Sequence, residues 1–217
     1  VQAVQISEGL FRQPFGLAML RVESAGYGAR AADAGVSTTL FPLIPAGEAP
    51  KLLDEILPEF AVFPSLSPPP KRALRRYILR SVLPFVVLAG LALPTLTLMG
   101  LMETFSSYYI IGAVSALTLA ALYGWAAFRA AGWAVEGDCF VSRSRSLART
   151  TSIAPRRRLQ SRSVVRNPLQ RRLDLATFRA RVASGGGGAT FEVVDIESDS
   201  AEALIPALGP KPRTALE

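Results

Sequence analysis

The sequence predicts an α+β, mainly β membrane protein whose two small related domains are joined by a two-helix transmembrane hairpin. Three observations lead to this fold class. Long apolar runs occupy the middle of the 217-residue chain, residues 1–26 and 159–184 resemble each other, and strand-like segments on both sides are each followed by one amphipathic helix. Strands closed by a helix are typical of α+β or capped-barrel modules. An offset of 158 residues excludes a solenoid, whose period is about 20–50 residues.

The apolar middle of the chain predicts two membrane spans. Uncharged runs of 22 and 25 residues stand on either side of Glu103. About 20 apolar residues suffice to cross the hydrocarbon core, and helices of soluble proteins rarely run so long without a polar face. We therefore expect transmembrane helices at 78–102 and 108–131. Pro84 and Pro94 predict a kink in the first helix rather than a break, because neighbouring groups can satisfy the freed carbonyls.

Basic residues flank these spans on one side only. The loop around Glu103 contains none. Because cytoplasmic flanks carry an excess of Lys and Arg, both ends of the chain are expected in the cytoplasm and the loop outside. The residues that determine this topology are Lys71, Arg72, Arg75, Arg76, Arg80 and Arg129.

The two similar segments predict equivalent strands. Alternation of apolar residues with Thr and Arg over 176–182 predicts a half-buried strand with its arginines exposed, and 18–23 repeats the pattern. The matched positions are Gln2 with Gln160, Leu17 with Leu175, Ala18 with Ala176, Arg21 with Arg179 and Ala25 with Ala183, while Phe11 and Phe15 fall opposite Leu169 and Leu173.

The remaining flanking segments predict a hairpin, one more strand and two closing helices. Residues 133–141 have the pattern of a hairpin that turns at Gly137, and 190–194 that of a strand. Pro50 suits the start of the first helix, and Asp199 with Glu202 has the spacing of a capping box for the second. The apolar stripes are Leu52, Leu53, Ile56, Leu57 and Phe60 in the first helix, and Ala201, Leu204, Ile205 and Leu208 in the second.

Composition also predicts the connections. Residues 63–77 form a Pro-rich basic linker, and the Pro/Gly-rich tail 210–217 is predicted to be disordered. The chain begins Val-Gln-Ala without a signal peptide. Since its first residues already match the middle of the second copy, we expect further residues upstream.

Charge is distributed unevenly and predicts an anionic partner for the second half. Residues 1–60 hold four basic residues against seven acidic ones, a net of −3, whereas 143–181 hold twelve arginines against one acid, a net of +11. Arginine suits phosphate, and anionic lipid attracts basic groups near the cytoplasmic surface. Topology signalling and solvated strand faces are the simpler interpretation. The candidate lipid-headgroup residues are Arg143, Arg145, Arg149, Arg156, Arg157, Arg158 and Arg162.

Other chemistries receive little support. The basic stretch contains almost no aromatic residue on which bases could stack, so we expect no nucleic-acid partner. The chain has no His, Cys139 has the pattern of a small strand residue facing a core, and 185–188 that of a glycine turn. Asp195, Glu197 and Asp199 fit a solvated turn and helix start better than a metal site. We therefore predict no catalytic residues, no metal and no cofactor.

One segment resembles a known family. Leu159-Gln160 followed by 167–177 is similar to the core signature of the bacterial membrane-flanked PH-like family, in its multi-copy, YdbT-like form, and 9–18 is a degenerate version. The residues that match the family motif are Gln160, Pro168, Leu169, Gln170, Arg171, Arg172, Leu175 and Ala176. Asp174 departs from the pattern, because the family more often has Gly there.

The resemblance implies PH-like two-sheet barrels, each closed by a C-terminal helix. On that template residues 1–62 are the C-terminal part of a PH-like domain that lacks its early strands, and 133–209 a complete one. The family has no established enzymatic activity. We expect the chain to lie in the bacterial cytoplasmic (inner) membrane. A fold does not determine a ligand, so inositol-lipid binding by eukaryotic PH domains is not transferred.

Together these features predict a non-enzymatic, multi-pass membrane protein that presents PH-like domains to the cytoplasm. Its expected partners are the membrane itself, anionic phospholipid and another membrane protein, in a setting such as envelope stress or resistance. The alternative is an accessory subunit of a membrane transport or export complex, with the hairpin as its working part. Polar residues deep in both spans would favour that alternative, and the sequence offers only Thr95, Thr97, Ser115 and Thr118.

Overall fold

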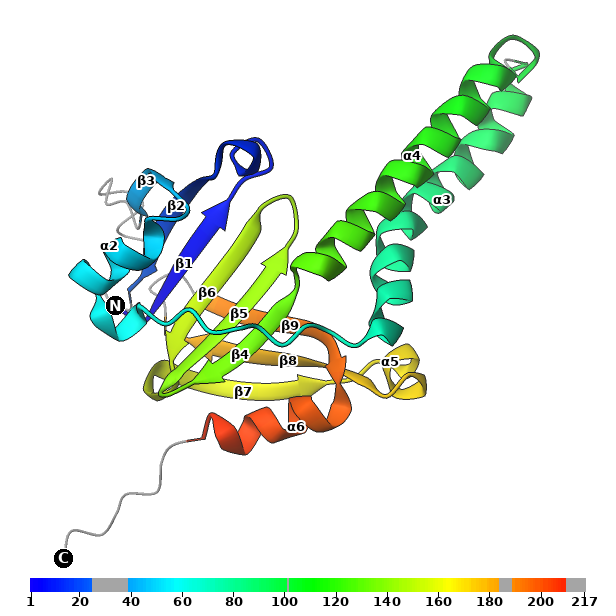
Figure 1. Cartoon of the computed structure of the whole chain (residues 1–217). Coiled ribbons are helices and arrows are strands. Elements are labelled where there is room, and N and C mark those ends of the chain that lie inside the picture. The colour runs from blue at the N-terminus through cyan, green and yellow to red at the C-terminus, as the bar shows by residue number, and fades with distance from the viewer. Residues whose placement is uncertain (25–38, 101, 184–188, 210–217) are drawn as a thin grey trace, which may run out of the picture. The chain divides into compact units, whose positions relative to one another are not determined.

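The chain divides into two compact units. The computed structural model describes residues 1–24, 39–100, 102–183 and 189–209, without the side chains of 102–106. A helical hairpin comprises Pro70–Arg129, and a sheet unit comprises Val1–Pro69 with Ala130–Glu217. Figure 1 shows both units.

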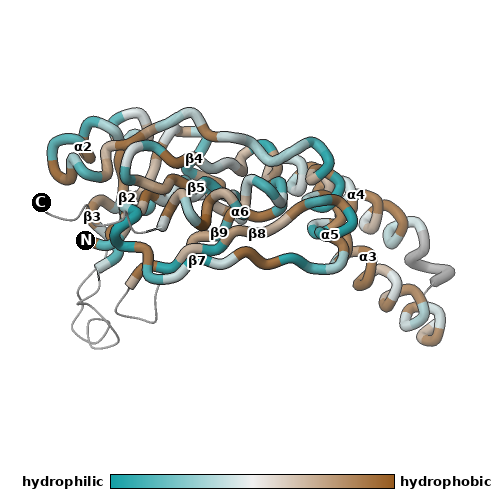
Figure 2. Tube along the Cα trace, turned by 90° about the horizontal axis from the view of Figure 1, so that it is seen from below, coloured by the Kyte–Doolittle hydropathy of each residue, from teal (hydrophilic) through white to brown (hydrophobic). Residues whose placement is uncertain are grey.

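The helical hairpin consists of two helices that are long and apolar enough to cross a membrane. Helix α3 is Leu74–Leu98 and α4 is Met102–Ala130, and the candidate spans are Lys71–Leu98 and Ser107–Ala130. Brown, hydrophobic stretches follow both helices in Figure 2. Helix α3 continues through both of its prolines, as predicted. It ends four residues earlier than expected, and the expected break at Glu103 is wrong, since this residue lies within α4.

One glycine brings the two helices into close contact. A Cβ on Gly124 would lie 2.6 Å from the Ser81 hydroxyl and 2.7 Å from the Tyr77 carbonyl oxygen, whereas Gly112 has nothing within 4 Å. Nearby, the rings of Tyr77 and Phe128 pack edge to face, with centroids 5.7 Å apart. Of the helix glycines, Gly124 is therefore the one that needs to lack a side chain.

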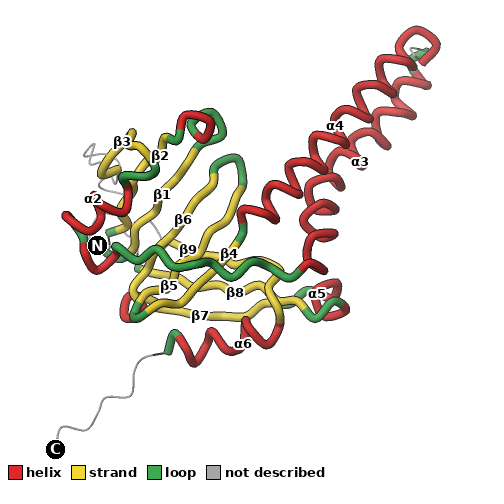
Figure 3. The backbone as a smooth tube through the Cα atoms, in the orientation of Figure 1, coloured by secondary structure: helices red, strands yellow, loops and turns green. Residues whose placement is uncertain are grey.

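The sheet unit contains two antiparallel sheets, shown as yellow strands in Figure 3. The larger sheet has the strand order β3 (Thr39–Pro45), β2 (Leu17–Glu23), β1 (Ala3–Glu8), β6 (Arg149–Pro155), β5 (Cys139–Arg145) and β4 (Gly132–Glu136), and the smaller has β7 (Leu159–Val165), β8 (Leu175–Val182) and β9 (Ala189–Glu197). The helical elements of this unit are η1 (Gln13–Phe15), α2 (Ala49–Ile56), η2 (Pro58–Phe60), η4 (Arg156–Arg158), α5 (Pro168–Arg172) and α6 (Ser198–Ala207).

The element order repeats along the chain. The first copy runs β1, η1, β2, β3, α2, and the second runs β7, α5, β8, β9, α6. The expected α+β class with one closing helix after each copy is therefore what the structure shows. Among the described residues no strand pair links the two sheets, so a closed barrel is not seen in this part of the chain.

The two copies meet in one sheet, which the sequence did not predict. Strand β1 pairs antiparallel with β6, with Val4 opposite Ile153 and Glu8 opposite Arg149. As a result, 1–69 and 130–217 form one compact unit. The division into an incomplete PH-like domain, 1–62, and a complete one, 133–209, stays a prediction, but the two segments share a continuous six-stranded sheet.

This sheet is buried on both faces at its centre. Along β5, Phe140 belongs to the core that β8, β9 and α6 cover, while Cys139 and Val141 belong to a second core with Leu53 of α2 and Phe60 of η2. A strand covered on both faces is apolar at successive positions. That explains why Cys-Phe-Val begins β5, and why the prediction that Cys139 faces a core is confirmed, since it is 5% exposed.

Local predictions are mostly confirmed. The hairpin of β4 and β5 turns at Gly137, which has φ 59°, and β8 buries Phe178 while exposing Arg179. The start of α6 was predicted wrongly. Its N-cap is Glu197, with no side-chain cap bond, because the turn of β9 into the helix comes two residues before Asp199.

The predicted apolar stripes are confirmed only in part. In α6, Ala201, Leu204 and Leu208 are buried, but Ile205 is 40% exposed. In the first closing helix Leu53 is fully buried, whereas Ile56 is 44% exposed. Both outliers lie in the last turn of a short helix.

Candidate functional site

The family motif builds a turn between β7 and β8. Asn167 and Gln170 form a capping box at the start of α5: the Asn167 Oδ1 accepts from the Gln170 backbone N–H (2.8 Å), and the Gln170 Oε1 accepts from the Asn167 N–H (3.0 Å). The Gln170 Nε2 then donates to Thr177 Oγ1 and to Asp195 Oδ1, both at 2.8 Å. Because Gln170 is 3% exposed, this glutamine is a structural residue.

The same network corrects the expectation for the acidic segment. Asp195 is 3% exposed and accepts a hydrogen bond from Gln170, so it does not lie in a solvated turn. Asp174, the residue that replaces the family's usual Gly, has φ 53°. Aspartate is among the few residues that adopt this left-handed conformation at modest cost, which accounts for the substitution.

The other motif residues divide between core and surface. Leu175 and Ala176 are fully buried at the start of β8, whereas Leu169 is 62% exposed. Pro168 occupies the first turn of α5, and Arg171 and Arg172 its exposed last turn. Gln160 is exposed in β7.

Both connections to the candidate spans leave the sheet unit at one end of the larger sheet. Strand β4 begins at Gly132, just after the second span ends at Ala130. The linker before the first span pairs with this strand, because Ser67 and Trp133 exchange hydrogen bonds of 2.8 and 3.1 Å. A Cβ on Gly132 would lie 2.9 Å from the Leu66 Cβ, so a glycine is needed there. We call this end of the larger sheet, where β4 begins at Gly132, the tethered end.

The predicted arginine set divides between the two ends of this sheet. Gly132 lies opposite Arg143, and Arg145 opposite Arg149, so these three arginines lie at the tethered end. The other four follow the opposite end of β6. They are Arg156, Arg157 and Arg158 in η4, and Arg162 in β7.

At the tethered end one arginine is neutralised and two are not. Arg149 forms a bidentate ion pair with Glu8, which is 9% exposed. Burial, and then the neighbouring Arg149, lower the pKa of Arg143, whose Nε has no hydrogen-bond partner in the described part of the chain. Its guanidinium stays charged at neutral pH. Arg145 has no ion-pair partner among the described residues.

The arginines at the far end mainly support the fold. The Arg156 Nε donates to the Gly209 carbonyl (2.7 Å) and the Arg162 Nη1 to that of Leu208. These carbonyls lie at the C-terminus of α6, where a cation is favourable. Arg157 forms an ion pair with Glu59.

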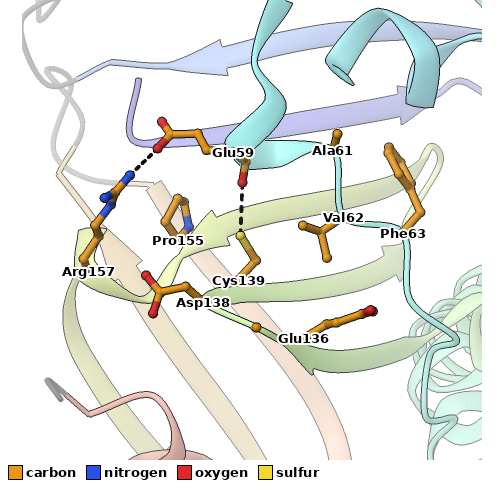
Figure 4. A pocket seen from close by; sticks show the side chains of 10 residues that line it. Glu59, Ala61, Val62, Phe63, Glu136, Asp138, Cys139, Pro155 and Arg157 are labelled. Atoms are coloured by element: carbon orange, nitrogen blue, oxygen red, sulfur yellow. Dashed lines mark hydrogen bonds and ion pairs between the residues drawn. The ribbon is translucent and has the colours of Figure 1, made fainter. Parts of the chain in front are cut away.

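An open cavity of about 450 Å³ separates η2 and the linker from the turn of β4 and β5, as Figure 4 shows. In it the Cys139 thiol donates to the Glu59 carbonyl oxygen at 3.3 Å. Burial, then Asp138 and Glu59, raise the pKa of Cys139, so the thiol is not activated. No group of three or more His, Cys, Asp or Glu side chains in the described part of the chain could hold a metal.

The basic residues that were predicted to determine topology lie before and at the start of α3 and at the end of α4. Lys71 and Arg72 are in the short helical turn before α3, and Arg129 is in the last turn of α4, where its guanidinium stacks 4.9 Å from the Trp125 ring centroid. Arg75, Arg76 and Arg80 occupy the first two turns of α3.

Sequence reasoning missed a group of exposed apolar residues. Phe11 is 85% exposed, Phe15 77%, Leu147 73% and Leu10 48%. The first two were considered only as partners in the repeat. The sequence predicted no strand at 3–8 or 149–155, so nothing marked these residues as parts of turns.

Comparisons with known proteins agree with this architecture. The family model for the bacterial PH domain matches residues 1–60 and 78–209. The chain is 29% identical over 205 residues to the UPF0699 transmembrane protein YdbT of Bacillus subtilis (strain 168). That match covers 94% of this chain but only 40% of the relative's length. No solved structure matches the chain. Neither the family nor the relative carries a description as an enzyme.

Proposed function

Because the chain belongs to the bacterial PH domain family and is a membrane protein with two candidate spans, we propose that it is a non-enzymatic protein of the bacterial cytoplasmic membrane whose PH-like sheet unit contacts anionic phospholipid. The sheet unit faces the cytoplasm in this proposal. Its basic tethered end lies against the lipid headgroups.

A single observation supports this proposal: Arg143, Arg145 and Arg149 lie at the end of the larger sheet where β4 begins, and β4 follows the second candidate span. Arg143 lies directly opposite Gly132, and paired Cα atoms of antiparallel strands are about 5 Å apart. The end of the second span is only two residues further. Of the three, Arg143 is therefore the one paired with the strand start that continues from the span, and Arg145 and Arg149 lie at the same end of the sheet.

The net charge of this end also supports lipid contact. Glu8 is the carboxylate that contacts these arginines, and it is already paired with Arg149. Each basic group near an anionic surface contributes roughly 1 kcal/mol. Arg145 is the clearest contributor, since it has no ion-pair partner among the described residues.

A lipid titration tests this contact. The full chain, held in zwitterionic micelles, is titrated with short-chain phosphatidylglycerol, with short-chain phosphatidylcholine as the neutral comparison. The variant Arg145→Gln is expected to weaken phosphatidylglycerol binding about fivefold, which corresponds to roughly 1 kcal/mol. Arg181→Gln, at an exposed arginine of β8, is the matched control and should change nothing. Equal binding of the two lipids would overturn the proposal.

The cytoplasmic orientation follows from the one-sided distribution of Lys and Arg and has its own test. In a Cys139→Ser background, a cysteine at Ser107 should react with an impermeant maleimide on intact cells. A cysteine at Ile205, in α6, should react only after lysis. The reverse pattern would place the sheet unit outside.

The alternative role in transport has no observation in its favour. The hydroxyls of Thr95, Thr97 and Thr118 each donate to carbonyls of their own helix. Polar groups satisfied in this way offer no path for a solute or proton, which supports an anchoring function for the hairpin.

A further inference from the structure

Two neighbouring turns of the larger sheet carry large apolar side chains in water. The turn between β1 and β2 holds Leu10, Phe11 and Phe15, which are 48%, 85% and 77% exposed, and the turn between β5 and β6 holds Leu147, which is 73% exposed. We call these four residues the apolar tip. Single exposed apolar residues are ordinary, but a cluster marks an interaction surface.

Strand register places both turns side by side at the tethered end. Glu8, the last residue of β1, pairs with Arg149, the first of β6. Arg149 in turn lies opposite Arg145, the last residue of β5. The two turns therefore extend from the same ends of the strands, at the tethered end, and Figure 1 shows them close together. Strand β4 begins at this end as well, since Gly132 lies opposite Arg143.

The exposure of the tip is built into an ordered turn. The Gly9 carbonyl accepts from the backbone N–H groups of Arg12 (2.9 Å) and Gln13 (3.0 Å). The Gln13 Nε2 donates to the Glu8 carbonyl at 2.9 Å, and Gly16 closes the turn with φ 62°. Hydrogen bonds thus hold the backbone while the Phe side chains stay outside, so the exposure does not arise from a loosely packed loop.

The chemistry around the tip matches a lipid–water interface. Aromatic and aliphatic side chains insert at the boundary of headgroups and acyl chains, and basic residues beside them contact phosphate. Here Arg145 immediately precedes the β5–β6 turn, and Arg12 lies within the other. The second candidate span ends at Ala130, two residues before Gly132. A bilayer surface is therefore the partner that the tether itself brings to this end.

We propose that the apolar tip inserts into the interface of the membrane that holds the two spans, so that the sheet unit is fixed at three points: the linker, the start of β4, and the tip. Tip insertion rests on the proposed function, and it adds to that function the residues that bind lipid through apolar contact. Acyl chains and glycerol backbones of phospholipid are the ligand, whatever the headgroup.

Lipid-dependent quenching tests the insertion in the full chain. In a Cys139→Ser background, Phe11→Cys carries an environment-sensitive fluorophore, and the protein is placed in phosphatidylcholine nanodiscs with and without nitroxide-labelled lipid. A probe at this 85% exposed position leaves the core untouched. We expect a blue-shifted emission and at least a twofold loss of intensity with nitroxide lipid. A probe on Ile205→Cys, in α6, is the control and should be quenched by aqueous iodide instead.

The outcomes separate this proposal from the broader one. A Phe11 probe that iodide quenches and nitroxide lipid does not would overturn tip insertion, even if Arg145 still binds phosphatidylglycerol. A probe shielded from both quenchers would also overturn it, in favour of a protein partner or a second copy. Quenching by nitroxide lipid in neutral nanodiscs supports insertion, even if Arg145→Gln leaves phosphatidylglycerol binding unchanged.

Discussion

The two sequence copies have the same backbone plan but use it differently. Gly16 in the first copy and Asp174 in the second occupy matched positions, and both are left-handed, with φ 62° and 53°. Yet β1 pairs with β6 and extends the larger sheet, whereas β7 is an edge strand of a separate sheet. The two copies therefore share the left-handed backbone conformation that the turn requires, but they differ in which strands they pair with and in their surfaces.

The turns that follow β1 and β7 show the divergence most clearly. In the second copy, buried Gln170 ties α5 to β8 and β9. The matched residue in the first copy is Arg12, whose side chain donates an exposed hydrogen bond to the Pro42 carbonyl at 3.1 Å. One turn is therefore held by its core contacts, and the other leaves its side chains available to the surroundings.

The largest predicted difference concerns these two matched residues. Gln170→Leu removes the amide donor from buried Asp195 and Thr177, so it should lower the free energy of unfolding by about 2–3 kcal/mol. Arg12→Leu should change it by no more than about 0.5 kcal/mol. Urea unfolding of the detergent-solubilised chain, followed by tryptophan fluorescence, measures both. Similar losses in the two variants would mean that the turns are held equally.

The left-handed positions provide a comparison of intermediate size. A side chain at Gly16 meets no atom within 4 Å, so Gly16→Ala reports backbone strain alone and should cost about 1 kcal/mol. Asp174→Gly relieves the corresponding strain, so its loss of stability should be smaller than that of Gly16→Ala. Thermal unfolding of both variants compares the two changes. A loss as large in Asp174→Gly would show that the aspartate side chain stabilises its turn.

The ion pairs of the two copies differ by less. Glu8 pairs with Arg149 across the β1–β6 junction, and Arg166 with Glu202, whose side chain is 62% exposed. Glu8→Gln should cost about 1 kcal/mol at most, because the Arg149 side chain is still 37% exposed and solvent screens the pair. Glu202→Gln should cost less, and 1 M salt should reduce the difference. Unfolding midpoints of both variants at low and high salt measure these differences in stability.

The smallest effect concerns Cys139, which the first copy covers. Its pKa is raised by burial, so the protonated thiol is favoured in the folded chain. The contribution of the protonated thiol to folding stability is therefore fully present below the pKa of an unfolded thiol, about 8.5. It is lost as pH rises through the pKa of the folded thiol. Cys139→Ser should remove this alkaline decline. Alkylation of Cys139 in the folded chain should be slow at pH 8. It should be faster in Glu8→Gln if the loss of the ion pair lets the first copy separate locally from β6.

Local features of the fold could be predicted from sequence because their signals are local. Apolar run lengths predicted the spans, and alternation predicted β8 with Arg179 exposed. The β1–β6 pairing could not be predicted, since Val4 and Ile153 are far apart in the chain and no nearby residue specifies which strands meet. The division of the arginines was missed for the same reason: Arg156 and Arg162 cap α6 through distant carbonyls.

The shared sheet has a consequence for how the protein is made. Residues 1–69 are synthesised before the two candidate spans, and β6, the partner of β1, comes only after them. Until then the edge of β1 lacks its partner, and Val4, Ile6 and Leu20 lack the strands that complete their core. Pairing at such sequence separation is slow. Membrane insertion of the hairpin therefore precedes completion of the sheet, and a ribosome paused within the spans leaves an aggregation-prone edge exposed.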